Sequence, residues 1–280
     1  MRSAFVAACL AMALCGHGAE ADVLDKIAET GRVQLGVRGA APPFSYLDFQ
    51  TEPAGLAVRL CEEVAARIGA QLGIDEIEID HGIVTASTRF GALGQGLTDI
   101  HCGPASVTLK RRETLDFSLL YFVDGAAVAE RPGGYDALLA NQTGKIGVLD
   151  GTTAVAVAQG LIETHGLDAE IEAFASHPRG LTALRDGKID IYVGDHAILL
   201  FQVSNMDEAG GVTVRDEILS FEPYALAVRG GERRLLLAID RALSDIYRSG
   251  LIFDLIRQEL GSFEIPPQTR AIYKIVGLPD

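Results

Sequence analysis

Strand-like and helix-like segments alternate along this chain from Arg32 onward, and this alternation limits the fold more than any other feature. Strand patterns occupy residues 33–37, 74–79, 99–102, 145–149, 169–174, 189–193 and 224–228. Helical patterns occupy residues 56–68, 89–97, 109–115, 154–162, 181–185, 197–202 and 233–249. Such alternation predicts an α/β fold with mainly parallel strands covered by helices. Ligands of these folds bind at the carboxyl ends of strands, beside helix N-termini.

The first 21 residues have the pattern of a signal peptide. Arg2 supplies a positive charge, residues 4–15 are uninterruptedly apolar, and Ala19-Glu20-Ala21 offers small residues at a cleavage site. A buried first helix is the alternative, but such a helix would need a polar face. The apolar run is too short to span a bilayer, which takes about 20 residues. We therefore expect cleavage after Ala21 and a soluble periplasmic protein.

The 280 residues suffice for one large domain or two small lobes. The net charge of −14, without a basic run, argues against nucleic acid and anionic membranes as partners. Of the four cysteines, Cys9 and Cys15 leave with the signal peptide. An even pair in an oxidising compartment predicts one disulfide, Cys61–Cys102, which would contribute about 4 kcal/mol. Two buried thiols are the alternative.

Short motifs follow one another along the chain. They are Pro43-Phe44-Ser45-Tyr46, Leu93-x-x-Gly96-x-x-Asp99, Ser106-Val107-Thr108-x-x-Arg111, Gly151-Thr152-Thr153 and Leu184-x-x-Gly187-x-Ile189-Asp190, followed by Asp195. In this order and spacing they resemble the family 3 solute-binding proteins of amino-acid ABC transporters. The resemblance covers nearly the whole mature chain.

The resemblance implies a periplasmic binding protein of type II, with two Rossmann-like α/β lobes joined by two hinge strands. One lobe is expected to comprise residues 22–124 and 222–280, and the other residues 125–221. Residues 125–129 and 223–228 are the expected hinge strands, which would let the lobes close on a ligand. The resemblance also implies a monomer that works with an inner-membrane ABC permease and carries no cofactor or metal.

An α-amino acid needs a cation for its carboxylate, and the planar fork of arginine suits that group. By the family pattern, Arg111 is the carboxylate clamp, with Ser106 beside it. Arg111 lies in the first turn of the helix predicted at 109–115, after its expected N-cap Thr108. A cation there opposes the helix dipole, so a bound anion explains it better than helix stability does. A solvated charge is the alternative, and we assign that role to Lys110 and Arg112.

In the second lobe, Gly151-Thr152-Thr153 precedes a helix, where free backbone N–H groups form an anion site. Plain N-capping by a threonine is the alternative, and both roles are compatible. Asp195 also opens a helix and is a candidate N-cap. The resemblance makes Thr152 and Thr153 ligand contacts and Asp195 the partner of the ligand ammonium.

Three further residues bear on the ligand side chain. Arg38, Arg89 and His177 follow or precede elements that should face the cleft, and together they resemble the glutamate/aspartate-binding branch. Surface charge is the alternative for the arginines, and an ordinary loop residue for His177. The chain departs from that branch at Ala86 and Pro104, where hydroxyls are expected. Three arginines against Asp195 leave a charge of +2, which favours an acidic amino acid over a basic one.

The predicted function is the substrate-binding component of an ABC transporter for amino acids, glutamate or aspartate in particular. The alternatives are another amino acid, a small dicarboxylate, or a periplasmic dehydratase-type enzyme on the same fold. Enzyme chemistry needs a positioned acid or base, and His177 is the only obvious candidate. We therefore predict a binding protein and no enzyme.

Overall fold

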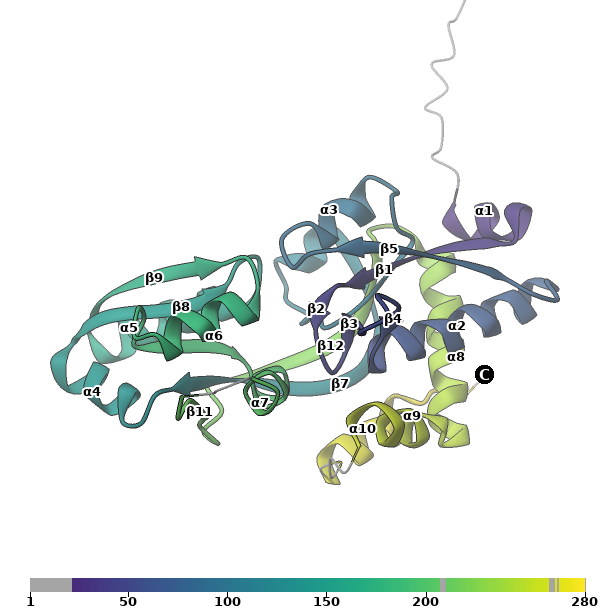
Figure 1. The fold of residues 1–280 in the computed structure, drawn as a ribbon. Coiled ribbons are helices and arrows are strands. Elements are labelled where there is room, and N and C mark those ends of the chain that lie inside the picture. The colour runs from purple at the N-terminus through teal and green to yellow at the C-terminus, as the bar shows by residue number, and fades with distance from the viewer. Residues whose placement is uncertain (1–21, 207–209, 262–264, 266, 280) are drawn as a thin grey trace, which may run out of the picture.

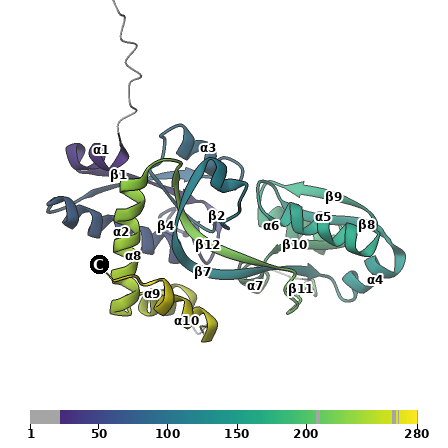
Figure 2. The same cartoon turned by 180° about the vertical axis from the view of Figure 1, so that it is seen from behind.

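The computed structural model describes residues 22–206, 210–261, 265 and 267–279. Two bodies of unequal size lie side by side, and two long strands run from one to the other (Figure 1, and Figure 2 from behind). The predicted signal peptide and its cleavage site fall outside the described residues. Among the described residues, no helix is both long and apolar enough to cross a membrane.

We call the larger body, which holds both described ends of the chain, the terminal lobe. Its elements are α1 (Val23–Thr30), β1 (Arg32–Arg38), β2 (Ala40–Ala41), β3 (Ser45–Leu47), β4 (Pro53–Ala54), α2 (Leu56–Leu72), β5 (Glu78–Val84), α3 (Arg89–Gly94), β6 (Ile100–Cys102), the 3₁₀ turn η1 (Arg111–Glu113), α8 (Arg233–Ser249), α9 (Leu251–Leu260) and α10 (Pro267–Val276). The middle lobe consists of α4 (Gly134–Asn141), β8 (Thr143–Leu149), α5 (Ala154–His165), β9 (Asp168–Phe174), α6 (His177–Arg185), β10 (Ile191–Asp195), α7 (His196–Ser204) and β11 (Thr213–Val214). The strands β7 (Leu115–Glu130) and β12 (Ser220–Arg229) belong to both lobes.

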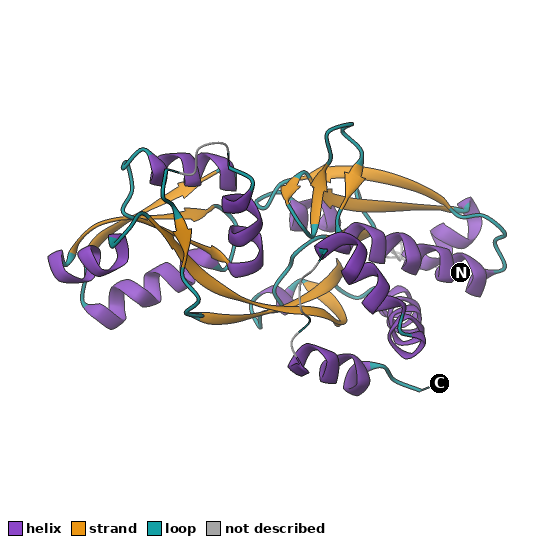
Figure 3. Cartoon of the chain, turned by 60° about the horizontal axis from the view of Figure 1, so that its bottom comes forward, coloured by secondary structure: helices purple, strands orange, loops and turns teal. Residues whose placement is uncertain are grey.

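Strands run through both lobes (Figure 3). Nine described strands form one sheet in the order β5-β1-β6-β12-β7-β10-β8-β9, with β11 beside β7. In the terminal lobe β1 is parallel to β5 and β6, and in the middle lobe β8 is parallel to β9 and β10. β7 and β12 are antiparallel to each other. The predicted α/β fold of two lobes and two joining strands is confirmed. The predicted lobe boundaries stay a prediction, since β7 and β12 run through both lobes.

The register of β7 and β12 differs from the expected hinge segments. Residues 126–130 pair with β10 inside the middle lobe, while most of 223–228 pairs with 116–123 inside the terminal lobe. The crossing therefore lies where 123–126 pair with 220–223. Because opposite residues of an antiparallel pair share a face, the pair Asp124–Glu222 places two carboxylates on one side of this crossing.

Each lobe has its own apolar core. In α2 the residues at helical spacing, Leu56, Leu60, Val64 and Ile68, are all fully buried, as the periodicity predicts. A separate cluster forms between the strands of the middle lobe and α5. Ile198 of α7 is packed into the core of the terminal lobe, so the two lobes touch each other at that helix.

Two predicted elements are wrong. The strand expected at 74–79 lies at 78–84, because pairing with β1 sets its register, whereas Ile74 and Ile77 pack against the core beside α2. The helix expected at 109–115 is only the 3₁₀ turn η1, because Leu115 already pairs with β12 at the start of β7. The expected N-cap Thr108 is wrong as well, since Lys110 precedes the turn. Thr108 Oγ1 still accepts a hydrogen bond from the backbone N–H of Arg111 at 3.2 Å.

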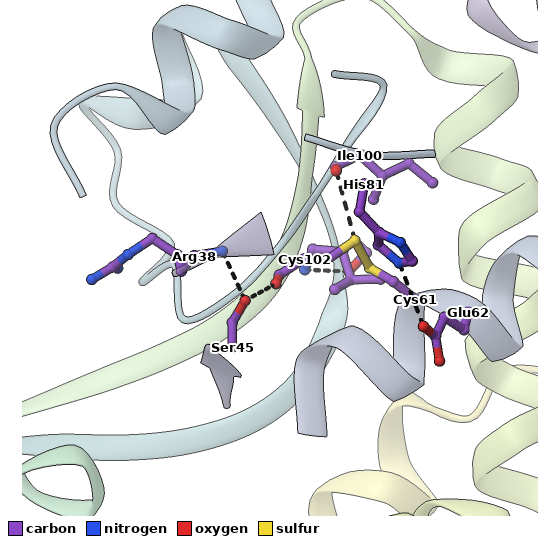
Figure 4. Close-up of a disulfide and its surroundings, with 9 residues drawn as sticks. Arg38, Ser45, Cys61, Glu62, His81, Ile100 and Cys102 are labelled. Carbon is purple, nitrogen blue, oxygen red and sulfur yellow. Dashed lines mark hydrogen bonds and ion pairs between the residues drawn. A yellow bond between two sulfur atoms is a disulfide. The ribbon is translucent and has the colours of Figure 1, made fainter. Parts of the chain in front are cut away.

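The predicted disulfide is present and joins α2 to β6. The Cys61 and Cys102 sulfurs are 2.08 Å apart, and the two residues are separated by 41 positions in the chain (Figure 4). The carbonyl of Cys102 accepts a hydrogen bond from Ser45 Oγ at 2.7 Å, and this Oγ accepts one from the backbone N–H of Arg38 at 2.9 Å. The disulfide therefore braces the strand end that carries Arg38, whose side chain points away from the sulfurs (Figure 4).

Candidate functional site

A pocket between the two lobes is lined by all eight residues that the sequence singles out for ligand binding. These are Arg38, Arg89, Ser106, Arg111, Thr152, Thr153, His177 and Asp195. The cavity volume is about 10 Å³, which is room for about one water molecule. An amino acid would therefore enter only when the lobes move apart, which fits a closed form of the protein.

Arg111 projects into the pocket from the short turn η1. Its Nη1 donates a hydrogen bond to the carbonyl of Ser106 at 2.6 Å. The backbone of Ser106 forms an isolated antiparallel β-bridge with Tyr224 of β12. Lys110 and Arg112 on the same turn are exposed, as the sequence predicts. Burial lowers the pKa of the Arg111 guanidinium, against the attraction of Glu222. An anion bound here would relieve that unfavourable burial.

Arg38 ends β1 and Arg89 begins α3, and only 4% and 2% of their surfaces are exposed. The surface-charge alternative is therefore wrong for both. Arg89 Nη2 donates to the carbonyl of Gly151 in the middle lobe at 3.1 Å, while its Nε and Nη1 are buried and have no hydrogen-bond partner in the described structure. Burial first, and then repulsion from Arg38 and Arg111, lowers the pKa of Arg89 well below its usual value.

The two threonines before α5 do not cap the helix with their side chains. Thr152 Oγ1 donates to the carbonyl of Leu149 at 2.8 Å, and Thr153 Oγ1 donates to Glu222 Oε2 on β12 at 2.8 Å. The alternative of plain side-chain capping is therefore wrong for the closed form. The first N–H groups of α5 remain directed at the pocket end of the helix, where an anion is favoured.

His177 is the first residue of α6 and only 3% exposed, so it is no ordinary loop residue. Its Nδ1 lies 3.2 Å from the hydroxyl of Tyr192. Burial, followed by repulsion from Arg38, lowers the pKa of His177 to about 3. The ring is therefore neutral at physiological pH. It is a weak base for catalysis but retains Nε2 for a hydrogen bond to a ligand.

Asp195 ends β10 on the opposite side of the pocket. Its Oδ2 accepts a hydrogen bond from the hydroxyl of Tyr224 at 2.6 Å, and its side chain makes no capping bond to α7. Burial raises the pKa of Asp195 to about 6, although Tyr224 and two arginines favour the ionised form. Asp195 therefore occupies the N-cap position of α7 without capping it through its side chain, and the carboxylate is held toward the hinge.

Sequence reasoning missed three polar groups of this site. Asp124, Glu222 and Tyr224 all lie on the crossing strands, and Pro104, Leu149 and Ile198 complete the pocket lining. The polar residues at 220, 222 and 224 alternate along β12, and this period of two was a signal that they share one face.

These groups also correct the charge argument. Three arginines against Asp195 alone leave +2, but with Asp124 and Glu222 ionised as well the formal sum is zero. Because burial, and then repulsion from Asp195, raises the pKa of Asp124 to about 7, Asp124 is partly protonated at neutral pH. The site is thus less positive than the sequence suggests. Among the described residues, no His, Cys, Asp or Glu group is arranged to hold a metal ion.

Gly151 of the middle lobe lies close to the backbone of Ala86 and Ser87 in the terminal lobe. Its φ is +72°, and an added Cβ would lie 2.8 Å from Ser87 Cα and 2.9 Å from the Ala86 carbonyl oxygen. We expect Gly151→Ala to lower the affinity for every ligand about tenfold, because overpacking of about 1–3 kcal/mol would hinder closure. Calorimetric titration of the variant and the wild type with the same amino acid measures the loss.

Gly166→Ala is the matched control for this prediction. Gly166 has a φ of +63° at the other end of α5, and an added Cβ would have no neighbour within 4 Å. It carries the same backbone strain without the contact between lobes. Equal affinities of the two variants would mean that close approach at Gly151 does not limit binding.

Comparison with known proteins places this chain among binding proteins. The family model described as bacterial extracellular solute-binding proteins, family 3, matches residues 33–262. The L-glutamate/L-aspartate-binding protein of Pseudomonas aeruginosa is 27% identical over 247 residues, which cover 88% of this chain and 82% of that protein. The glutamate/aspartate import solute-binding protein of Escherichia coli is 25% identical over 252 residues, with coverage of 87% and 83%. The structure of an ancestral arginine-binding protein bound to arginine matches with a TM-score of 0.73 and 26% identity, over 82% of this chain and 99% of that one.

Proposed function

This chain belongs to the bacterial extracellular solute-binding proteins of family 3, and on that premise we propose that it binds glutamate or aspartate between its lobes. In this proposal the protein works in the periplasm as a monomer and delivers the amino acid to an ABC permease. The relatives reported above are named as binding proteins, and the low pKa of His177 speaks against acid–base chemistry at physiological pH.

One observation carries the proposal. Arg38, Arg89 and Arg111 of the terminal lobe line the same pocket as Asp195 of the middle lobe. An α-amino acid joins a carboxylate to an ammonium group, so it is complementary to an arginine on one lobe and an aspartate on the other. A ligand that contacts both lobes binds the closed form better than the open one, and this difference drives closure.

The acidic side chain is favoured by the two arginines that the α-carboxylate does not need. Arg38 and Arg89 are both buried, and two guanidinium nitrogens of Arg89 have no partner in the described structure. A buried donor without a partner is unfavourable, and a second carboxylate would supply acceptors. A lysine or arginine ligand would instead add a cation beside three arginines, which is costly in a water-poor pocket.

A thermal-shift panel tests this function with purified protein. We expect L-glutamate or L-aspartate, at about 100 times its dissociation constant, to stabilise the fold by about 2.7 kcal/mol. For a chain of this length that corresponds to a rise in Tm of about 5–10 °C. The panel includes neutral and basic amino acids, and succinate as a dicarboxylate without an ammonium group. A shift with only basic or large apolar amino acids would contradict the proposal, and an equal shift with succinate would exclude a required ammonium contact.

A further inference from the structure

Two buried carboxyl groups at the hinge are joined through one hydroxyl. The hydroxyl of Tyr224 lies 2.6 Å from Asp195 Oδ2 and 3.4 Å from Asp124 Oδ2. This hydroxyl has one proton, so it donates to Asp195, which has the shorter contact. Asp124 therefore lies close to a second carboxyl group without a strong donor from the tyrosine.

Asp124 has a structural task that the sequence assigns to Asp195. Both of its carboxyl oxygens lie near the backbone nitrogen of Ala197, at 3.3 and 3.2 Å, in the first turn of α7. Asp195 occupies the N-cap position of that helix but makes no capping bond with its side chain. Asp124 accepts the hydrogen bond of the Ala197 N–H group that an N-cap side chain would otherwise accept. The Asp195 carboxylate therefore does not cap α7 and can face the pocket.

We propose that Asp124 is a positioning residue for the ammonium site, and that binding of an amino acid expels a proton that Asp124 and Asp195 share in the ligand-free protein. This inference rests on the proposed function, since it takes the ammonium group of the ligand to lie against Asp195. It extends that function by coupling capture of the ligand to pH.

The groups that face the two carboxyls decide the sign. Arg38, Arg89 and Arg111 lie on the terminal-lobe side of the pocket. The charge of Glu222 on β12 raises the pKa of Asp195. The charge of Asp195 in turn contributes to raising the pKa values of Tyr121 and Tyr192, which are raised mainly by burial. Burial raises the pKa of Asp124 to about 7 and that of Asp195 to about 6. Interacting carboxyls titrate as a pair, so the ligand-free pair holds about one proton between these values.

The exchange balances in charge. An ammonium group brings one positive charge against the pair, the O–H bond of the protonated carboxyl breaks, and its electron pair stays on the carboxylate oxygen. The proton leaves to the buffer, so the summed charge of the ammonium group and the carboxyl pair does not change, while the ligand carboxylates lie against the three arginines of the pocket. A closed pocket favours this outcome because an additional buried charge without a partner is costly. Since a proton is released, affinity falls as pH falls through the range in which the pair is protonated.

Calorimetry with L-glutamate at about pH 6.5 in buffers of different ionisation enthalpy counts the released protons. We expect the wild-type protein to release about half a proton to one proton, and Asp124→Asn to release almost none. Between about pH 7.5 and about pH 5.5, the wild-type affinity should fall about tenfold and that of Asp124→Asn less than about threefold. Asp240→Asn is the control, because Asp240 also accepts a backbone hydrogen bond, from Leu119 at 2.8 Å, but does not line the pocket. It should behave as the wild type.

Two further measurements separate the parts of the inference. The amide oxygen of Asp124→Asn retains the acceptor for Ala197, whereas Asp124→Ala loses it and should weaken binding at every pH. In the ligand-free protein, NMR of carboxyl-labelled aspartates should show a pair that titrates between about pH 5 and about pH 8 and that disappears in Asp124→Asn. If every aspartate titrates below about pH 5, or if the two proteins release equal numbers of protons, the inference is wrong. If no amino acid binds, the proposed function is refuted. The NMR titration would still decide whether the two carboxyl groups share a proton.

Discussion

Replacing Arg89 by methionine lowers the affinity for L-glutamate by about 30-fold or more, because loss of one partner from a buried charge pair costs about 2–5 kcal/mol. Arg38→Met acts in the same direction. Neutral amino acids lose less than about threefold, because in the proposed function these two arginines bind the side-chain carboxylate, which a neutral ligand lacks. Calorimetric titration of each variant with L-glutamate and with L-serine gives both affinities.

Misfolding does not account for such a loss. The guanidinium of Arg89 is almost fully buried and lies near Arg38 and Arg111. It stacks on the Phe90 ring, 4.2 Å from the ring centroid, and among the described residues it is hydrogen-bonded only through Nη2. Replacing a poorly paired buried charge by an apolar side chain is often neutral or stabilising. The free energy of unfolding of ligand-free Arg89→Met should therefore not fall below that of the wild type.

Arg112→Met is the matched control for the arginine variants. Arg112 is exposed beside Arg111 on the same turn, so its removal changes the net charge equally without altering the pocket. Its affinity for L-glutamate should stay within about twofold of the wild type, since an exposed charge is worth little. If Arg89→Met weakens L-glutamate and L-serine equally, the assignment of Arg89 to an acidic side chain fails.

Removing the disulfide has the largest expected effect on stability. The double variant Cys61→Ala and Cys102→Ala should lose about 4 kcal/mol, because the loop between them spans 41 positions and becomes free in the unfolded chain. Urea denaturation of the two proteins gives this difference. In a thermal scan it corresponds to a fall in Tm of roughly 8–16 °C.

The reduced wild-type protein is the control for the lost sulfur atoms. It retains both buried side chains and lacks only the covalent bond, so its stability should match that of the double variant within about 1 kcal/mol. A double variant that is as stable as the oxidised protein would show that the disulfide does not stabilise the fold by restricting the conformations of the unfolded chain. A variant less stable than the reduced protein would assign the difference to packing around α2 and β6.

Much of the architecture followed from local patterns. The spacing of Leu56, Leu60, Val64 and Ile68 predicts α2 because one face of a helix has to be apolar to join a core, and all four are buried. The strand at 74–79 failed for a related reason. Its isoleucines alternate with acidic residues, but Ile74 and Ile77 pack against the core outside any strand, and β1 pairs only from Glu78 onward. Period and composition are local properties, whereas strand register depends on a distant neighbour.

By itself, the sequence determined the fold class, the disulfide pair and the residues that meet in the interlobe pocket. These features could be predicted because local sequence patterns mark the ends of strands and the starts of helices, and because the motifs follow one another in the order that the family resemblance implies. Only the tertiary structure decided how the polar groups are shared. Asp124 accepts a hydrogen bond from the first turn of α7, 73 positions away in the chain. Tyr224 donates to Asp195 over 29 positions, and Thr153 donates to Glu222 over 69 positions. Each of these bonds forms only when two lobes with separate cores are brought against the same pair of strands, and no local pattern records that juxtaposition.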